Sequence, residues 1–166
     1  MANVEAFDIL KRSGKVAFYG VPSEDGKFTY HRMKGFTTLS TEKNPKEYSR
    51  QYIDEESERT DVVGYSPSMS FAFDRAKGNA AHDDIISIFD NEKLGADAIR
   101  PIVIVDLAGK SENAVMRMFS VIPSTEGDGT DAYTYSGTFK ASGDKQVGTA
   151  TTTDEWQTIT FAGSGE

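Results

Sequence analysis

Short stretches of alternating apolar and polar residues recur along most of the chain. Met69, Phe71 and Phe73 alternate with small or charged residues, which is the two-residue period of a strand with one buried face. Asp25-Gly26 separates two such stretches and predicts a hairpin turn between them. The pattern predicts strands over residues 16–21, 28–33, 36–42, 69–74, 101–107, 114–122, 133–140, 147–153 and 156–161.

One segment departs from this period and indicates a helix over residues 79–94. Ile85 and Ile88 fall on one helical face, as expected for a helix with a single apolar stripe. Asp83 and Asp84 lie near its amino-terminal end, where carboxylates cap free backbone amides and suit the helix dipole. A single helix of this kind predicts a lid that covers one side of a sheet.

Two further features of the sequence help to define the fold. Residues 101–107 are almost continuously apolar, which indicates a strand covered on both faces. The next strand, over 114–122, should end at Pro123, because proline lacks a backbone donor. Together the elements predict one mainly β (α+β) domain over residues 1–166, with a flexible tail over residues 162–166.

The most unusual stretch runs over residues 43–66, between two predicted strands. It opens with Asn44-Pro45, a turn signal because proline disfavours the helical region for the preceding residue. Residues 47–53 mix aromatic and charged side chains, and five acids follow with Arg59 among them. These acids are Asp54, Glu55, Glu56, Glu58 and Asp61. The stretch predicts a long charged loop or hairpin arm that leaves the β-core and returns to it.

Composition narrows the function classes. The chain has no cysteine, which excludes disulfides, thiolate metal sites and thiol nucleophiles. Its net charge of −8 disfavours nucleic-acid binding through overall charge, because phosphate binding needs lysine and arginine. No apolar run approaches the length of a membrane span, and no basic-apolar leader opens the chain. We therefore expect synthesis in a cytoplasm and no membrane partner.

Motifs for catalysis or metal binding are weak. His31 and His82 lie on different predicted elements, and neither belongs to an H-E-x-x-H pattern. No G-x-S-x-G elbow, P-loop or G-x-G-x-x-G run is present. Glu126, Asp128 and Asp131 carry oxygen ligands that suit calcium, but they lack EF-hand spacing, so a solvated acidic loop is favoured. We therefore expect no enzyme activity, no cofactor and no metal.

Two segments of the chain resemble a known family. The first comprises residues 44–48, Arg50, Tyr52, residues 54–55, 58–65 and 70–74, and the second comprises residues 135–140 and 148–150. In these residues, and in the order of elements between them, the chain resembles the major tail tube protein of long-tailed (siphovirus-type) bacteriophages, especially those that infect Gram-positive bacteria. The similarity extends from about residue 30 to about residue 161 and is one of extended sequence, without a short catalytic signature.

The resemblance implies two packed antiparallel sheets, in a β-sandwich or barrel, with one flanking helix. In that family six subunits join sheets edge to edge into a ring, and rings stack into the hollow tube through which the genome is ejected. A long loop reaches across ring boundaries, and residues 43–66 occupy its position here. The implied partners are further copies of the chain and the tape measure, tail terminator and distal tail proteins of the virion; DNA passes without specific binding.

The charged arm has two interpretations. A charge run is usually a solvated, mobile loop. Its aromatic and arginine residues favour an arm that contacts a neighbouring subunit, because these types are enriched in interfaces. They are Tyr48, Arg50, Tyr52, Arg59 and Tyr65. With the resemblance we favour the inter-subunit arm, and we expect some of its five acids to line the lumen or the ring junction, where they would repel DNA.

Two alternatives stay open at this point. One is the tube of a contractile tail or of a type VI-like secretion system, since these share the implied architecture. The other is a monomeric β-sandwich module that binds carbohydrate by stacking Trp156, Tyr133 and Tyr135 on sugar rings. The alternating pattern instead places Tyr133 and Tyr135 in the core. Concentration-dependent assembly distinguishes a tube protein from such a module.

Overall fold

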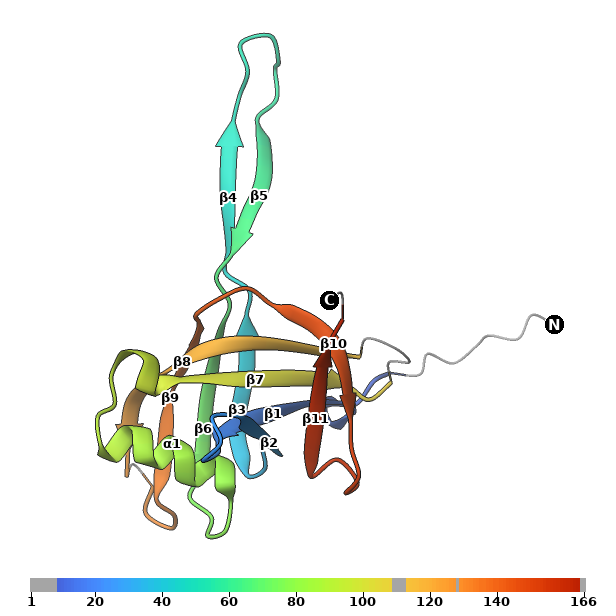
Figure 1. Cartoon of the computed structure of the whole chain (residues 1–166). Helices are drawn as coiled ribbons and strands as arrows, with labels where there is room; N and C mark the ends of the chain where they lie inside the picture. Colours follow the sequence, from blue (N-terminus) through green and yellow to red (C-terminus); the bar gives the residue numbers. More distant parts are fainter. Residues whose placement is uncertain (1–8, 109–112, 128, 165–166) are drawn as a thin grey trace, which may run out of the picture.

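The residues that the structure describes form eleven β-strands and one α-helix (Figure 1). This computed structural model describes residues 9–108, 113–127 and 129–164. The strands are β1 (Lys15–Pro22), β2 (Phe28–Arg32), β3 (Phe36–Glu42), β4 (Pro45–Arg50), β5 (Arg59–Tyr65), β6 (Ser68–Asp74), β7 (Ile99–Asp106), β8 (Ala114–Glu126), β9 (Thr134–Ala141), β10 (Gln146–Thr151) and β11 (Thr158–Gly163). The helix α1 spans Ala80–Asp90, and two 3₁₀ helices span Arg12–Gly14 and Gly95–Ala98. The predicted mainly β (α+β) class is confirmed.

Nine of these strands form one sheet, and part of that sheet closes on itself. The strand order is β10-β11-β2-β1-β7-β8-β9-β6-β3, and β10 pairs with β8 as well as with β11. The six strands from β10 round to β8 therefore form a closed circuit. Its interior holds the buried side chains of Val16, Phe18, Val103, Val105 and Ile159. Closure pairs strand edges that an open sheet would expose.

The strand β8 is long enough to belong to both halves of the sheet. Its residues 114–116 pair with β10, whereas residues 119–126 pair with β9. The strands β8, β9, β6 and β3 thereby form a second, four-stranded half that packs over the first. Within the second half, Phe71 of β6 stacks on Phe139 of β9 with ring centroids 4.3 Å apart. Tyr19 of β1 packs against Phe139 and so joins the two halves. The two packed antiparallel layers expected from the resemblance thus arise from one continuous sheet.

The strand β7 is covered on both faces, as its apolar run predicts. Ile102 belongs to the core beneath α1, whereas Val103 faces the interior of the closed circuit. The prediction that the next strand ends at Pro123 is wrong, because β8 continues to Glu126 through a register shift between Pro123 and Thr125. Proline is tolerated at such irregularities and on edge strands, where its missing donor leaves no gap in a ladder.

The helix α1 covers one end of the core with the face that the sequence predicts. Its side chains Ile85 and Ile88 are fully buried. The amino-terminal cap is Asn79, whose side-chain oxygen accepts a hydrogen bond from the backbone amide of His82 at 3.3 Å. The predicted capping role of Asp84 is therefore wrong, because its carboxylate is engaged elsewhere, as described below.

The helix ends four residues before the predicted boundary at residue 94. Asn91 donates its side-chain amide to the carbonyl of Ser87 at 3.0 Å, and Glu92 takes a positive φ of 47°, so the helical path stops there. No helix among the described residues is long and apolar enough to cross a membrane.

The strand β11 corrects the predicted carboxyl-terminal tail. Ala162 pairs with Thr149, and Gly163 pairs with Gly148. The prediction of a flexible tail is therefore wrong for residues 162 and 163, which extend the sheet. Residues 165–166 lie outside the described residues.

Candidate assembly interface

The arm predicted over residues 43–66 is a two-stranded hairpin that projects from the body of the protein (Figure 1). The strand β4 follows β3 and β5 precedes β6, so the hairpin continues the β3–β6 pair outward. Asn44 at its base has a φ of 47°, a region that asparagine tolerates well. Its side-chain amide donates to the carbonyl of Ser66 at 3.1 Å and to the hydroxyl of Ser68 at 3.0 Å. Asn44 therefore fixes the position at which the arm leaves the sheet.

Charged and aromatic side chains gather on one face of the hairpin. Arg50 lies directly opposite Arg59, and opposed like charges destabilise a strand pair. The carboxylate of Glu55 offsets this repulsion by accepting two hydrogen bonds from Arg59, at 2.6 and 2.8 Å. The guanidinium of Arg50 lies 5.4 Å from the ring centroid of Tyr48, within the range of cation–π attraction. The structure thus brings three of the five predicted contact residues together on this face.

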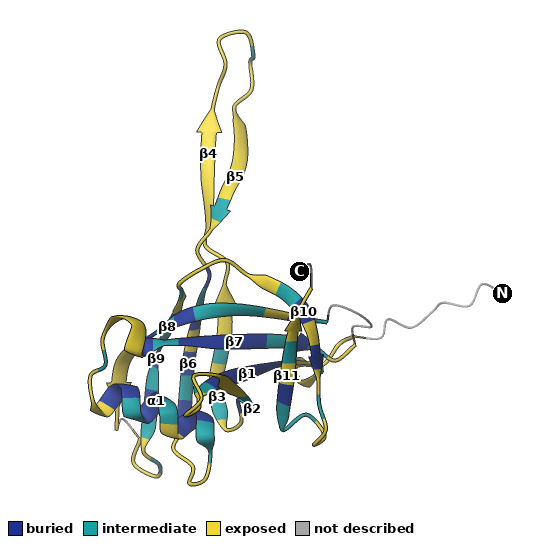
Figure 2. Cartoon of the chain, viewed as in Figure 1, coloured by how far each residue is buried: buried dark blue, intermediate teal, exposed yellow. Residues whose placement is uncertain are grey.

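The arm has no apolar core of its own. Every residue of β4 is exposed, and so is every residue of β5 except Gly64 (Figure 2). A two-stranded hairpin without cover is at best marginally stable in water. Its exposed apolar side chains are Tyr48, Tyr52, Ile53, Val62, Val63 and Tyr65. Sequence reasoning named the tyrosines and missed the three aliphatic residues, which charged neighbours obscure. Exposed apolar sets of this kind are typical of interaction surfaces.

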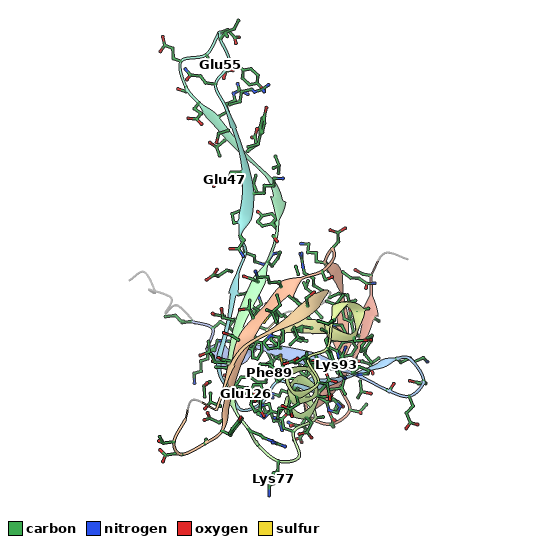
Figure 3. The ribbon with its side chains drawn as sticks, turned by 90° about the vertical axis from the view of Figure 1, so that its left-hand side faces the viewer. Glu47, Glu55, Lys77, Phe89, Lys93 and Glu126 are labelled. Carbon is green, nitrogen blue, oxygen red and sulfur yellow. The ribbon has the colours of Figure 1, made fainter. Side chains whose placement is uncertain are left out.

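The five acids belong to the arm, and Glu55 lies at its outer end, far from the body (Figure 3). Four of them occupy the turn between β4 and β5, and Asp61 lies in β5 opposite Tyr48. Among the described residues, Glu55 is the one member of this set that forms an ion pair. The tip therefore carries unpaired carboxylates, which favour cations on an approaching surface.

The four-stranded half keeps two open edges in the part of the chain that is described. On one side, β3 pairs with β6 alone. On the other side, residues 121–126 of β8 pair with β9, while the pairing of β8 with β7 extends only to Ser120. An unpaired edge presents a row of amides and carbonyls that can pair with another chain. The two edges flank the same four strands.

One face of this half is turned away from the core and is lined mainly by hydroxyl groups. Along β6, the buried Met69, Phe71 and Phe73 alternate with more exposed, smaller residues. The hydroxyl-bearing residues in register on this face are Thr38, Ser40, Ser68, Ser70, Ser120, Thr125, Thr134, Ser136 and Thr138. The same face also carries the charged residues Glu42, Asp74 and Lys140. We call this surface the hydroxyl face.

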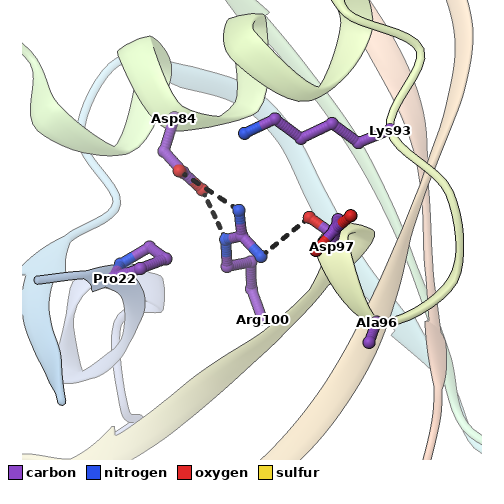
Figure 4. Close-up of a pocket in the computed structure, with 6 residues that line it drawn as sticks. All are labelled: Pro22, Asp84, Lys93, Ala96, Asp97 and Arg100. Carbon is purple, nitrogen blue, oxygen red and sulfur yellow. Dashed lines mark hydrogen bonds and ion pairs between the residues drawn. The ribbon is translucent and has the colours of Figure 1, made fainter. Parts of the chain in front are cut away.

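A pocket beside α1 contains a buried ion pair (Figure 4). Arg100 of β7 donates to Asp84 of α1 through Nε at 2.9 Å, and its Nη1 donates to the carbonyls of Asp97 and Ile99. Tyr19 donates its hydroxyl to the same carboxylate at 2.5 Å. Burial, and then the adjacent charge of Asp84, raises the pKa of Tyr19 well above its ordinary value. These polar groups hydrogen-bond to one another and to backbone carbonyls of the same chain, so the ion pair anchors α1 to β7.

The described residues include no cluster of three or more side chains that could hold a metal ion. His82 stacks on Phe73 with centroids 4.1 Å apart, and its Nδ1 accepts from the amide of Ala76 at 3.3 Å. Burial lowers the pKa of His82, which favours a neutral structural histidine. In the acidic loop considered for calcium, Glu126 ends β8, and Asp128 lies outside the described residues.

The aromatic residues considered for carbohydrate stacking do not form one platform. Tyr135 is buried, and Trp156 packs against Phe18 of the closed circuit with centroids 6.5 Å apart. Tyr133 is 51% exposed, so its predicted place in the core is wrong; β9 and its alternation begin only at Thr134. The carbohydrate-binding alternative therefore lacks the surface that suggested it.

No protein-family model matches the sequence, and no curated protein matches it. Solved structures do match the fold. A chain from the tail of an empty gene transfer agent particle with C6 symmetry superposes with a TM-score of 0.59 and 11% identity, over 84% of this chain and 98% of that chain. A chain from the virion of a native gene transfer agent particle gives a TM-score of 0.56 and 10% identity, with the same coverage. This protein therefore shares its fold with a chain of the gene transfer agent tail.

Proposed function

We propose that this chain is a structural virion protein that polymerises as stacked hexameric rings into the hollow tube of a phage-type tail. The observation that carries the proposal is the four-stranded half with two open edges, placed beside an exposed arm that lacks a core. The shared fold with a chain of a gene transfer agent tail supports it, and the C6 symmetry of that particle supports six subunits in a ring. The tube serves as the conduit for genome ejection.

Ring formation follows from the directions of the strands. The four strands β3, β6, β9 and β8 are antiparallel to one another in turn. Because their number is even, β3 of one copy runs antiparallel to β8 of the next copy, and the sheet continues without interruption. The contact joins two different surfaces, so repetition closes it into a ring when the rotation allows. Ring closure then pairs every edge that a single copy leaves open.

The arm supplies contacts between rings. Its exposed apolar residues and its arginines are the types that bury well against a partner. In this arrangement the residues that contact a neighbouring subunit are Tyr48, Arg50, Tyr52, Arg59 and Tyr65. Each arm contributes a modest contact, and many arms acting together hold a long tube.

The hydroxyl face lines the lumen, because the core and α1 cover the other side of the same strands. DNA has to pass this wall without binding to it. Hydroxyl groups offer no cation to phosphate, and Glu42 and Asp74 outnumber Lys140 on the face. A tube of chains with a net charge of −8 also repels phosphate at long range. The acids of the arm then lie at the ring junction, namely Asp54, Glu55, Glu56, Glu58 and Asp61.

Within the virion, the tube meets further copies of itself and the tape measure, tail terminator and distal tail proteins. The subunit is made in the host cytoplasm and has a structural, non-enzymatic role. Its assignment to siphovirus-type phages of Gram-positive bacteria rests on the sequence resemblance alone. The same edges and arm suit the tube of a contractile tail, which differs by a surrounding sheath.

Electron microscopy of the purified protein over a range of concentrations tests the proposal. We expect hollow rings or tubes for the full chain. A variant in which residues 45–65 are replaced by a short glycine-serine turn should form rings that do not stack, because its edges remain and its arm is gone. The proposal is wrong if both proteins stay monomeric at every concentration, or if the variant without the arm still forms long tubes.

A further inference from the structure

A groove with an apolar floor lies at the base of the arm. It has a volume of about 860 Å³, within the range of sites that hold a ligand or peptide segment. Its floor includes Leu39 of β3, Met69 of β6 and Val115 of β8, which come from three separate strands. Val115 is 37% exposed, so the floor is open to an incoming side chain.

The rim of this groove is basic. Lysines from three separate parts of the chain line it, namely Lys15, Lys43 and Lys145. Arg12 also lines it and is held in place by donating to the carbonyls of Lys15, at 2.7 Å, and Leu39, at 3.2 Å. Among the described residues, none of these lysines forms an ion pair. One acid, Asp106, also lines the groove, and the basic residues outnumber it. The groove therefore presents net positive charge around an apolar centre.

The tip of the arm carries the complementary pattern. Ile53 is fully exposed, at 109% of its reference area, although a large aliphatic side chain gains from burial. The acids Asp54, Glu56 and Glu58 belong to the same turn between β4 and β5. The adjacent Glu55 is already paired with Arg59. An exposed apolar side chain next to unpaired carboxylates is complementary to an apolar floor with a mainly basic rim.

The tip cannot reach the groove of its own chain. Lys43 lies at the base of the arm, and about ten residues at about 3.3 Å each place Ile53 roughly 30 Å away. The hairpin also projects outward from the body (Figure 1). The occupant has to come from another molecule.

We propose that the tip of the arm of one copy docks in this groove of a second copy, with Ile53 on the apolar floor and the tip carboxylates against the lysines. This inference rests on the proposed function and names the receptor for its arm. The contact joins tip to base, so it repeats from copy to copy and builds a filament. Each step along the arm then advances by roughly 30–40 Å.

Disulfide trapping tests the docking directly, because the chain contains no cysteine. An Ile53→Cys/Val115→Cys variant should form a ladder of covalently linked dimers, trimers and longer species under mild oxidation. An Ile53→Cys/Leu94→Cys variant is the control, because Leu94 is more exposed than Val115, at 83% against 37%, and does not line the groove. The docking is wrong if the control gives the same ladder, or if neither variant is linked at any concentration.

Charge reversal provides a second readout. Lys43→Glu/Lys145→Glu, added to the Ile53→Cys/Val115→Cys variant, should lower the yield of linked species more than about tenfold, because like charges then meet. Adding Glu56→Lys/Glu58→Lys should restore most of the yield by recreating opposite charges. An unchanged yield of linked species after the charge reversal would contradict the docking.

Two outcomes separate this inference from other occupants and from the proposed function. An intrachain disulfide in an Ala6→Cys/Val115→Cys variant would assign the groove to the amino-terminal segment and overturn the docking. If the Ile53→Cys/Val115→Cys variant forms tubes but no disulfide between copies under oxidation, the docking is refuted while the tube proposal stands. A tip-to-base ladder from protein that forms no hollow tube would support the docking and refute the tube.

Discussion

Replacing Arg100 with methionine should destabilise the protein strongly, although the residue lies far from the arm. The side chain of Arg100 is 7% exposed and that of Asp84 is 11% exposed, so the ion pair between them is buried. Methionine keeps a long apolar side chain in place and removes the guanidinium. The carboxylate of Asp84 then keeps the hydroxyl of Tyr19 and loses its cation.

The expected cost follows from this geometry. Removing one partner of a buried ion pair leaves an uncompensated charge and costs about 3–5 kcal/mol. Single domains have a total free energy of unfolding of about 5–15 kcal/mol, so the loss is a large fraction. With a urea dependence of about 2 kcal/mol per M, the unfolding midpoint should fall by about 2 M.

Urea unfolding followed by circular dichroism measures this shift. Lys93→Met is the matched control, because Lys93 lines the same pocket and forms no ion pair among the described residues. A triple variant, Tyr19→Phe/Asp84→Leu/Arg100→Met, removes every member of the polar cluster and should recover most of the loss. A midpoint for Arg100→Met within about 0.5 M of the wild type, or one equal to that of Lys93→Met, would refute the reasoning.

Three further perturbations have defined outcomes. Phe71→Ala should cost about 3–5 kcal/mol in urea unfolding, because Phe71 is 2% exposed and stacks on Phe139; a loss below about 1 kcal/mol would contradict this packing. Burial lowers the pKa of His82 below its ordinary value of 6.5, so the stability it contributes is full above that pH and falls as the pH drops below it. The unfolding midpoint should therefore decrease from pH 7 to pH 5, and His82→Phe should remove most of that decrease; an unchanged slope would refute the assignment. The carboxylate of Asp154 accepts hydrogen bonds from Thr158, which lowers its pKa to about 2, and NMR titration should find it there; a value near 3.8 would contradict the turn geometry.

The alternation of apolar residues predicts most strands and the helix, because burial on one face imposes a local period. The arm is also predictable, since Asn44-Pro45 breaks the strand and the following acids oppose burial. The exposed Ile53, Val62 and Val63 are not, because a charged neighbourhood hides single aliphatic residues. Only the structure shows that no part of the described chain covers them.

The closure of the sheet through β10 and β8 could not be predicted, because it joins residues about thirty positions apart through backbone groups that leave no mark in the sequence. Arg100 was missed for a related reason. A charged residue at the start of an apolar strand resembles a solvent-exposed boundary, and its partner Asp84 resembles a helix cap. The continuation of β8 past Pro123 depends on a register shift that the presence of proline does not predict.

The central claim is that the open edges of the four-stranded half join neighbouring copies around a lumen. Cryo-electron microscopy of the assembled protein tests it most directly. The account predicts hollow rings in which β3 of each copy pairs with residues 121–126 of β8 in the next, with the hydroxyl face toward the hole. Rings with β3 left unpaired, rings with α1 toward the hole, or a strictly monomeric protein would contradict it.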